Sequence, residues 1–108
     1  MDAEAIVPKS VYKILRPDEW ERLLSTGSFE GSVDDERDGF IHLSTLEQLP
    51  VTLSKHYQGV PEVIVAEVRS AGLSIRMEES RGGALFPHLY GSLPLAAVIK
   101  TELGKLAP

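Results

Sequence analysis

The chain has 108 residues, the usual length of one domain with one hydrophobic core, so we treat residues 1–108 as a single domain and exclude two-domain enzymes. Hydrophobic residues make up 43% and charged residues 25%, a composition that excludes a disordered protein. The net charge of -5 has the wrong sign for binding duplex nucleic acid, and the absence of cysteine excludes disulfides, iron–sulfur clusters and a cysteine nucleophile.

The N-terminal segment, residues 1–9, begins with acidic residues and has no apolar run of signal-peptide length, so we expect it to be flexible. No run of 18 apolar residues occurs anywhere in the chain. We therefore expect a cytoplasmic, monomeric protein that does not enter a membrane.

The first elements in chain order are a strand and a helix. Residues 11–15 are rich in β-forming side chains and are followed by Pro17, which favours the first position of a helix. Trp20, Leu23 and Leu24 form an apolar stripe at helical spacing, and Gly27 can end the helix. The spacing therefore predicts a short helix that faces the core.

Residues 31–39 are polar and acidic without helical or strand periodicity, which predicts an exposed loop. Residues 40–44 follow as a strand in which Phe40, His42 and Ser44 share one face. Ser44 and Glu47 have the spacing of a capping box for a helix that reaches Tyr57. Pro50 is unfavourable inside a helix, so we expect either a kink or a later start.

The second half of the chain contains three further strands. Residues 62–69 form a nearly continuous apolar run, as in a central strand covered on both faces. Residues 73–78 alternate, which places Ser74, Arg76 and Glu78 on the face opposite the core. With a last β-type run at 96–100, which follows residues 85–91, and no regular alternation of strands and helices, the pattern predicts an α+β fold.

The segment from Arg76 to Tyr90 is the densest in polar and charged side chains. Successive amides at Gly82-Gly83 can form an anion-binding turn, and Arg76 or Arg81 could donate two hydrogen bonds to a phosphate or carboxylate. The alternative is a hairpin turn with a solvated charge pair.

The chain has three histidines, the side chains best suited to proton transfer near neutral pH. His42 and His88 each fit a general base or a ligand donor, and each fits equally a buried side chain whose partner is a backbone carbonyl or, for His42, the acidic segment before it. His56, late in a helix, reads as a surface residue.

Other kinds of site have weaker support. No HxH, HxxxH or HExxH spacing is present, so we predict no metal site. No GxSxG motif supports a serine hydrolase. Trp20, Phe40 and Phe86 fit core positions better than a platform for stacking bases.

Two long motifs, Gly39-Phe40-Ile41-His42-Leu43-Ser44 and Phe86-Pro87-His88-Leu89-Tyr90-Gly91, have Ser80-Arg81-Gly82-Gly83 before the second. In this order they resemble the small bacterial proteins of domain-of-unknown-function family 952, over residues 11–100. The resemblance implies an ADP-ribosyltransferase-like fold, a split mixed β-sheet with two or three short helices that cradles NAD. RNA 2′-phosphotransferases are similar in their His-Leu-Ser strand. Residues 40–44 would then line one wall of a nucleotide cleft, with His88 and Tyr90 on the other.

Residues and resemblance together give the functional expectation of a cleft for a nucleotide or another phosphorylated small molecule, with NAD as the candidate cofactor and group transfer as the candidate reaction. The alternative is a non-catalytic binding module whose polar motifs are structural. The candidate catalytic residues are His42, His88 and Glu78, and the candidate ligand-binding residues are Ser44, Arg76, Ser80, Arg81, Gly82, Gly83 and Tyr90.

Overall fold

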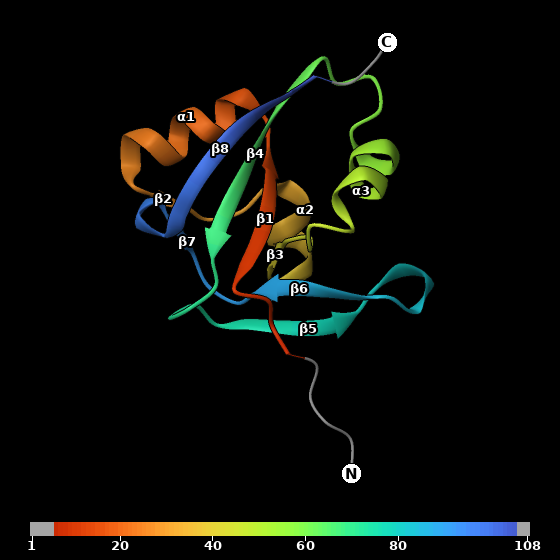
Figure 1. The fold of residues 1–108 in the computed structure, drawn as a ribbon. Coiled ribbons are helices and arrows are strands. Elements are labelled where there is room, and N and C mark those ends of the chain that lie inside the picture. The colour runs from red at the N-terminus through yellow and green to blue at the C-terminus, as the bar shows by residue number, and fades with distance from the viewer. Residues whose placement is uncertain (1–5, 106–108) are drawn as a thin grey trace.

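The computed structural model describes residues 6–105, leaving out the side chains of Arg81, Leu103 and Lys105. Its centre is an antiparallel sheet of three strands in the order β1 (Ser10–Leu15), β4 (Glu62–Arg69) and β8 (Val98–Lys105). Figure 1 shows β4 between its two neighbours, with the strands of a second sheet running across them below. The prediction of a central strand at 62–69 is confirmed, while the last strand extends beyond the predicted 96–100.

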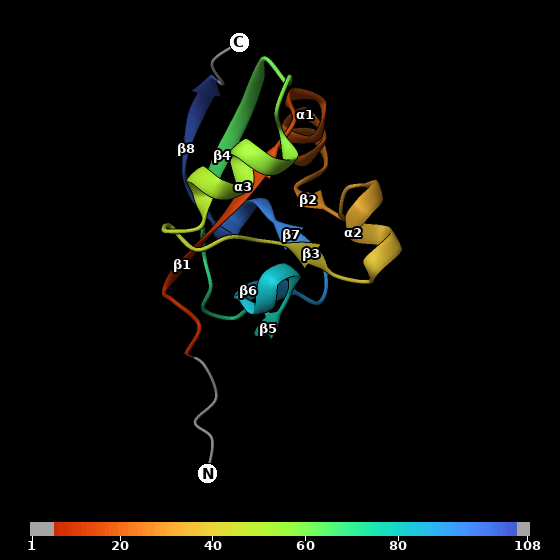
Figure 2. The same cartoon turned by 90° about the vertical axis from the view of Figure 1, so that its right-hand side faces the viewer.

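Helices cover both faces of this sheet. On one face, Val11 and Leu15 pack with Leu23 of α1 (Pro17–Thr26). On the other, Ile14 and Val63 pack with Leu49 of α3 (Leu49–His56). Figure 2 shows the two helices on opposite sides of β1 and β4. The alternation of β1 side chains between two cores explains why the run carries apolar residues at neighbouring positions.

The second sheet has the order β3 (Ile41–His42), β6 (Leu85–Leu89) and β5 (Ile75–Glu79). A third pair joins β2 (Ser28–Phe29) to β7 (Leu93–Pro94), and single turns of 3-10 helix lie at Arg81–Gly83 and Leu95–Ala97. Every strand pair in residues 6–105 is antiparallel, so the α+β class is confirmed and the sheet is split, but it is not the mixed sheet predicted.

The register of the second sheet decides which side chains lie together. His42 pairs with His88, and His88 pairs with Arg76 across the next strand, while Ile41 and Leu89 occupy the row beside them. Opposite residues of an antiparallel pair point to the same face. The polar motifs of three separate segments therefore share one face, and the apolar residues between them join the core.

One local prediction is corrected. The predicted loop at 31–39 contains α2 (Val33–Asp38), because Ser32 caps the helix by accepting from the Asp35 amide at 3.1 Å and left-handed Gly39 ends it. In the N-terminal segment, the carbonyl of Pro8 accepts from the hydroxyl of Ser70 at 2.6 Å, and the flexibility of residues 1–9 stays a prediction. Residues 1–5 lie outside the described residues.

Pro50 left two possibilities for the helix after Ser44, a kink or a later start. The structure shows the later start, because α3 begins at Leu49. Thr45 and Gln48 close the turn before the helix, with the Thr45 amide donating to the side chain of Gln48 at 3.0 Å, and Gln48 is the N-cap residue. Pro50 then lies in the first turn, where its missing amide costs nothing. Across the described residues the longest helix has ten residues, too few to cross a membrane.

Candidate functional site

Helix α2 carries a carboxylate into the interior beside the first sheet. Asp35 is only 2% exposed, and Gly31 passes so close to it that a Cβ atom there would stand 2.9 Å from the Cβ of Asp35. Gly31 also has φ +122°, a conformation that side-chain-bearing residues avoid. The tight approach of the chain at Gly31 therefore allows Asp35 to be buried.

Four donors surround the Asp35 carboxylate. Its Oδ1 accepts from the backbone amide of His42 at 3.0 Å and faces the Nδ1 of His42 at 2.6 Å. Its Oδ2 accepts from the Nζ of Lys13 at 3.0 Å and from the amide of Ser32 at 2.9 Å. We call Lys13, Ser32, Asp35, Asp38 and His42 the Asp35 network. It ties β1, α2 and β3 together, and its central ion pair, Lys13 and Asp35, is almost fully removed from solvent.

The Asp35 network sets the charge state of its central carboxylate. Burial by itself would raise the pKa of Asp35, but the hydrogen bond from His42, the charge of Lys13 and the two backbone amides outweigh burial and hold the pKa well below its usual range. Lys13 is 4% exposed and also donates to the carbonyl of His42 at 3.0 Å. Both ions are thus paired and hydrogen-bonded, the condition under which buried charges are tolerated.

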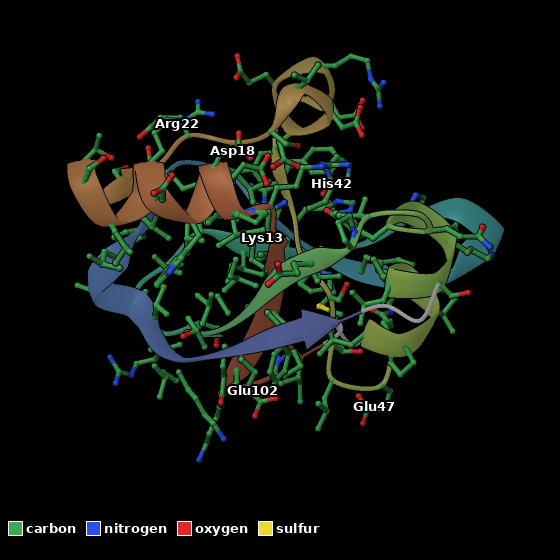
Figure 3. The ribbon with its side chains drawn as sticks, turned by 90° about the horizontal axis from the view of Figure 1, so that it is seen from above. Lys13, Asp18, Arg22, His42, Glu47 and Glu102 are labelled. Carbon is green, nitrogen blue, oxygen red and sulfur yellow. The ribbon has the colours of Figure 1, made fainter. Side chains whose placement is uncertain are left out.

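The second ring nitrogen of His42 faces another carboxylate. Its Nε2 lies 2.9 Å from Oδ2 of Asp38, the last residue of α2. Carboxylates only accept hydrogen bonds, so His42 bonds to both Asp35 and Asp38 when both of its nitrogens carry protons. Figure 3 shows His42 near the middle of the molecule, with Lys13 beneath it.

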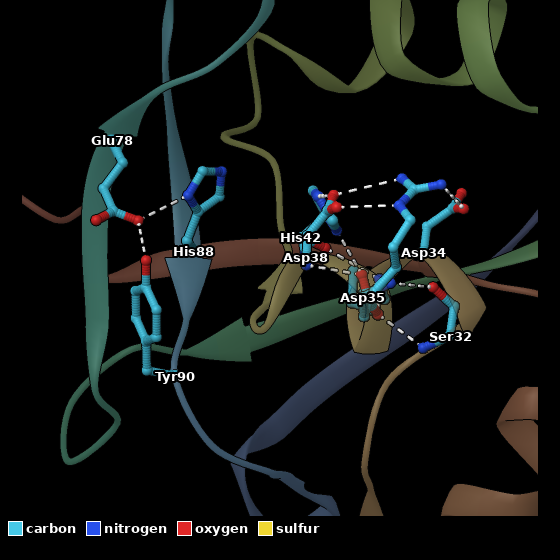
Figure 4. A network of polar contacts seen from close by, with 10 residues as sticks. Ser32, Asp34, Asp35, Asp38, His42, Glu78, His88 and Tyr90 are labelled. Carbon is cyan, nitrogen blue, oxygen red and sulfur yellow. Dashed lines mark hydrogen bonds and ion pairs between the residues drawn. The ribbon is translucent and has the colours of Figure 1, made fainter.

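A second histidine and carboxylate pair lies on β6 and β5. Glu78 Oε1 lies 2.8 Å from Nδ1 of His88 and accepts from the hydroxyl of Tyr90 at 2.6 Å. The hydrogen bonds from Tyr90 and His88 lower the pKa of Glu78, so it is a carboxylate acceptor. We call Glu78, His88 and Tyr90 the Glu78 cluster, drawn beside the Asp35 network in Figure 4.

The far nitrogen of His88 has no partner. His88 is 4% exposed, and its Nε2 is buried without a hydrogen bond among the described residues. Because Nδ1 donates to Glu78, Nε2 is the nitrogen that carries the lone pair in the neutral ring. Buried polar atoms are normally paired, so an open acceptor of this kind is expected where a ligand or water binds.

Phe40 connects the two histidines. Its ring stacks on His88 with the centroids 3.9 Å apart and lies 4.7 Å from the ring of His42. The two histidine rings are 5.8 Å apart, edge to face. Phe40 is half-buried against polar rings, so it is a wall of the site as well as part of the packing.

A cleft of about 740 Å³ opens above this face of the second sheet. Side chains from α2, β3, α3 and the end of β1 line it, including all three histidines, Phe86 of β6, Arg16 and Tyr57. The Arg16 guanidinium lies over the Tyr57 ring at 5.2 Å. Burial, followed by the nearby charge of Glu19, raises the pKa of Tyr57 to about 12, so its hydroxyl keeps its proton and donates to the carbonyl of Ile14.

The predicted residues fall into two groups. Those that line the cleft are His42, Ser44, Ser80 and His88. Those that do not line it are Arg76, Glu78, Gly82, Gly83 and Tyr90, of which Glu78 and Tyr90 stand behind His88. Arg76 lies over the ring of Tyr90 at 5.6 Å. The side chain of Arg81 lies outside the described part of the chain.

The glycine turn is bonded to itself. The amide of Gly83 donates to the carbonyl of Ser80 at 3.1 Å, and the amide of Ser80 donates to the carbonyl of Ala84 at 2.9 Å. Gly82 and Gly83 both have positive φ, which explains the pair of glycines without a ligand. The hairpin-turn interpretation therefore accounts for this segment, and binding of an anion there stays a prediction.

The candidate residues chosen from the sequence do not include four that line the cleft, Lys13, Asp35, Arg37 and Asp38. The interpretation in which His42 is satisfied by the acidic segment before it agrees with the two contacts to Asp35 and Asp38. The signal for Lys13 was a charged residue between two inward-facing apolar residues of one strand, which demands a buried partner. No three His or carboxylate residues among those described are grouped as a metal site requires.

Comparisons with known proteins agree with the family motifs. Residues 14–101 match the family model described as protein of unknown function, DUF952. The crystal structure of protein CC0527 from Caulobacter crescentus is similar, with 40% identity and a TM-score of 0.85 over 91% of this chain and 88% of that one. The solution structure of CC0527 is similar at 39% identity and a TM-score of 0.82, over 93% of this chain and 88% of that one. A search of curated proteins gives no match. The chain belongs to the DUF952 family.

Proposed function

We propose that the cleft above β3 and β6 binds a nucleotide or another phosphorylated small molecule, and that His88 accepts a hydrogen bond from a hydroxyl group of this ligand. The observation that carries the proposal is the buried, unpartnered Nε2 of His88 in the cleft wall. An unpaired buried acceptor costs about 1–3 kcal/mol, which a ligand hydroxyl would recover.

The rest of the lining supports a ligand with three kinds of group. Phe86 and Val51 offer apolar surface to a flat ring, and Ser44 and Thr52 add hydroxyl groups. Arg16, which has no ion-pair partner among the described side chains, is available for an anion. Apolar lining with a few directed polar groups is typical of small-molecule sites.

Glu78 gives His88 a second capacity, which is proton transfer. A carboxylate at Nδ1 fixes the orientation of the ring and stabilises the charge that appears when Nε2 takes a proton. In a group transfer, His88 would remove the proton of an attacking hydroxyl as the new bond to the transferred group forms and the bond to the leaving group breaks. With NAD as the donor, the broken bond is the one to nicotinamide, which leaves with the electron pair. The ADP-ribosyltransferase resemblance of the sequence motifs makes NAD the first candidate donor, and the open acceptor at His88 fits a ribose hydroxyl.

Isothermal titration with NAD, ADP-ribose and AMP tests the proposal. His88→Asn removes Nε2 while its amide can still donate to Glu78, and Arg69→Asn is the control because Arg69 is exposed at the end of β4 and does not line the cleft. We expect binding by the wild type that weakens about tenfold or more in His88→Asn, or about 1.4 kcal/mol, and little in Arg69→Asn. Absence of heat at millimolar ligand would contradict the proposal.

A second candidate function is a non-catalytic interaction module whose polar motifs hold the fold together. The observation that favours it is the Asp35 network, in which every contact of His42 is internal. Thermal melting separates the two. If His88→Asn lowers the melting temperature as much as Leu89→Ala, a truncation in the core, the structural role extends to His88 as well.

A further inference from the structure

The ring of His42 and the guanidinium of Arg37 converge on the carboxylate of Asp38. Nε2 of His42 lies 2.9 Å from its Oδ2, and Nε of Arg37 donates to its Oδ1 at 3.1 Å. Nη2 of Arg37 adds a longer contact to Oδ2 at 3.5 Å. A histidine ring nitrogen and a guanidinium around one carboxylate make the arrangement by which proteins hold a phosphate or carboxylate of a ligand. Here the anion is supplied by the chain itself.

Asp38 is held far less firmly than Asp35. Its side chain is 33% exposed, against 2% for Asp35, and it accepts no backbone amide among the described hydrogen bonds. The next residue is Gly39 at φ +86°, which ends α2. Exposed ion pairs contribute little to stability, so releasing the Asp38 carboxylate costs little free energy.

The guanidinium of Arg37 and the ring of His42 each have a second partner that holds them in place without Asp38. Nη1 of Arg37 also pairs with Oδ1 of Asp34 at 3.2 Å, and Nδ1 of His42 remains bonded to buried Asp35. An incoming anion would therefore meet donors that are already oriented. Arg37, Asp38 and His42 all line the cleft, so the exchange would occur inside it.

We propose that Nε2 of His42 and the guanidinium of Arg37 form a binding site for a phosphate group of the ligand, and that the Asp38 carboxylate fills this site in the free protein. The inference deepens the proposed function and rests on it for the class of ligand. It assigns the anion to the α2 side of the cleft, instead of to the glycine turn at Gly82 and Gly83.

Inorganic phosphate titrated into the full chain at about pH 6, below the ordinary His pKa of about 6.5, tests the site. Asp38→Ala opens it, Asp38→Asn keeps the shape of the side chain without its charge, and Asp34→Ala is the matched control because it removes the other partner of Arg37. The readouts are the dissociation constant and the ring nitrogen resonances of His42.

We expect Asp38→Ala to bind phosphate about tenfold more tightly than the wild type, with a shift of the His42 Nε2 resonance on saturation. Asp38→Asn should bind more tightly than the wild type in the same direction, and Asp34→Ala should change affinity less than about threefold, as for a single exposed charge. Equal affinities of Asp38→Ala and Asp34→Ala, or a His42 resonance indifferent to phosphate, would overturn the inference. Melting curves verify that each variant is folded.

Nucleotide titrations separate this inference from the proposed function. If nucleotides bind the wild type and weaken in His88→Asn, but phosphate affinity is the same with and without Asp38, the anion site is wrong and the proposed function stands. If no nucleotide binds any variant while phosphate shifts His42 in Asp38→Ala, the anion site stands and the nucleotide class is wrong.

Discussion

The two histidines of the second sheet are paired in register on β3 and β6, and yet their surroundings differ. His42 faces a carboxylate at each nitrogen, one of them buried and bonded to Lys13. His88 faces one carboxylate, is itself buried, and leaves its Nε2 open. Equal placement in the sheet therefore gives one histidine that is satisfied inside the protein and one that is not.

The difference separates the cleft residues that hold the fold together from those that are open to a ligand. The inner side of the Asp35 network joins three elements through buried charges, so its loss should damage the fold. The Glu78 cluster is held by an exposed carboxylate and ends in an unused acceptor, so its loss should damage binding and leave the fold intact. Substitutions in the two groups can break or sharpen this division.

The largest expected effect is on stability, from Asp35→Asn. The change leaves the buried ammonium of Lys13 without its counter-charge, and removing one partner of a buried ion pair costs about 3–5 kcal/mol. Urea unfolding should show this loss, while Glu78→Gln, the matched change in the other group, should leave the midpoint nearly unchanged. The double variant Lys13→Met with Asp35→Asn should recover part of the loss. If Glu78→Gln lost as much stability as Asp35→Asn, the division between a structural Asp35 network and a ligand-binding Glu78 cluster would be wrong.

Acid should unfold the protein through the same carboxylate. The pKa of Asp35 is lowered in the folded state, so its contribution is complete above the unfolded pKa of about 3.9 and is lost as the pH falls toward the folded pKa. We expect the wild type to lose stability below about pH 4, and Asp35→Asn to show a shallower dependence there. Unfolding midpoints between pH 7 and pH 3 measure both slopes. Glu78→Gln should keep most of the wild-type slope.

Next in size is the effect of His88→Asn on ligand affinity. We expect nucleotide binding to weaken about tenfold or more, since the open acceptor is lost, while the melting temperature changes less than in Leu89→Ala. Calorimetric titration and thermal melting of the same samples supply both values. The reverse pattern, a large loss of stability with unchanged affinity, would make His88 a structural residue, as we expect Asp35 to be.

Much of the fold could be predicted because the local patterns agreed with the tertiary structure. The apolar run at 62–69 became the central strand, and the alternation in 73–78 placed Arg76 and Glu78 on the polar face of β5. The prediction of a loop at 31–39 was wrong because the acidic residues of this segment were taken as a sign of a loop. Ser32, Asp35 and Gly39 carried the cap signals of a short helix, but so short an element has no apolar period to detect.

The candidate site was predictable only in part, because its contacts join residues far apart in the chain. Period two placed His42 and Ser44 on one face of a strand, His88 was selected through its motif, and all three line the cleft. Which carboxylate faces which histidine depends on the register between β3, β6 and β5, and local sequence does not encode that register. The contact between Lys13 and Asp35, which lie 22 positions apart, could not be predicted for the same reason.

The smallest expected effect is also the finest probe of the Glu78 cluster. Tyr90→Phe removes the hydroxyl that donates to Glu78, and this hydrogen bond is the main cause of the lowered pKa of that carboxyl, ahead of the one from His88. The pKa of Glu78 should therefore rise toward its ordinary value in the variant, with little change in melting temperature because both side chains are exposed or partly exposed. Side-chain carboxyl resonances followed from pH 2 to pH 7 measure the shift, and Ser92→Ala, which removes a hydroxyl donor from Glu30 instead, is the matched control. Since a carboxylate released from Tyr90 keeps its contact with Nδ1 of His88, nucleotide affinity should persist; a loss as large as in His88→Asn would show that Tyr90 holds His88 in place and belongs to the binding site itself.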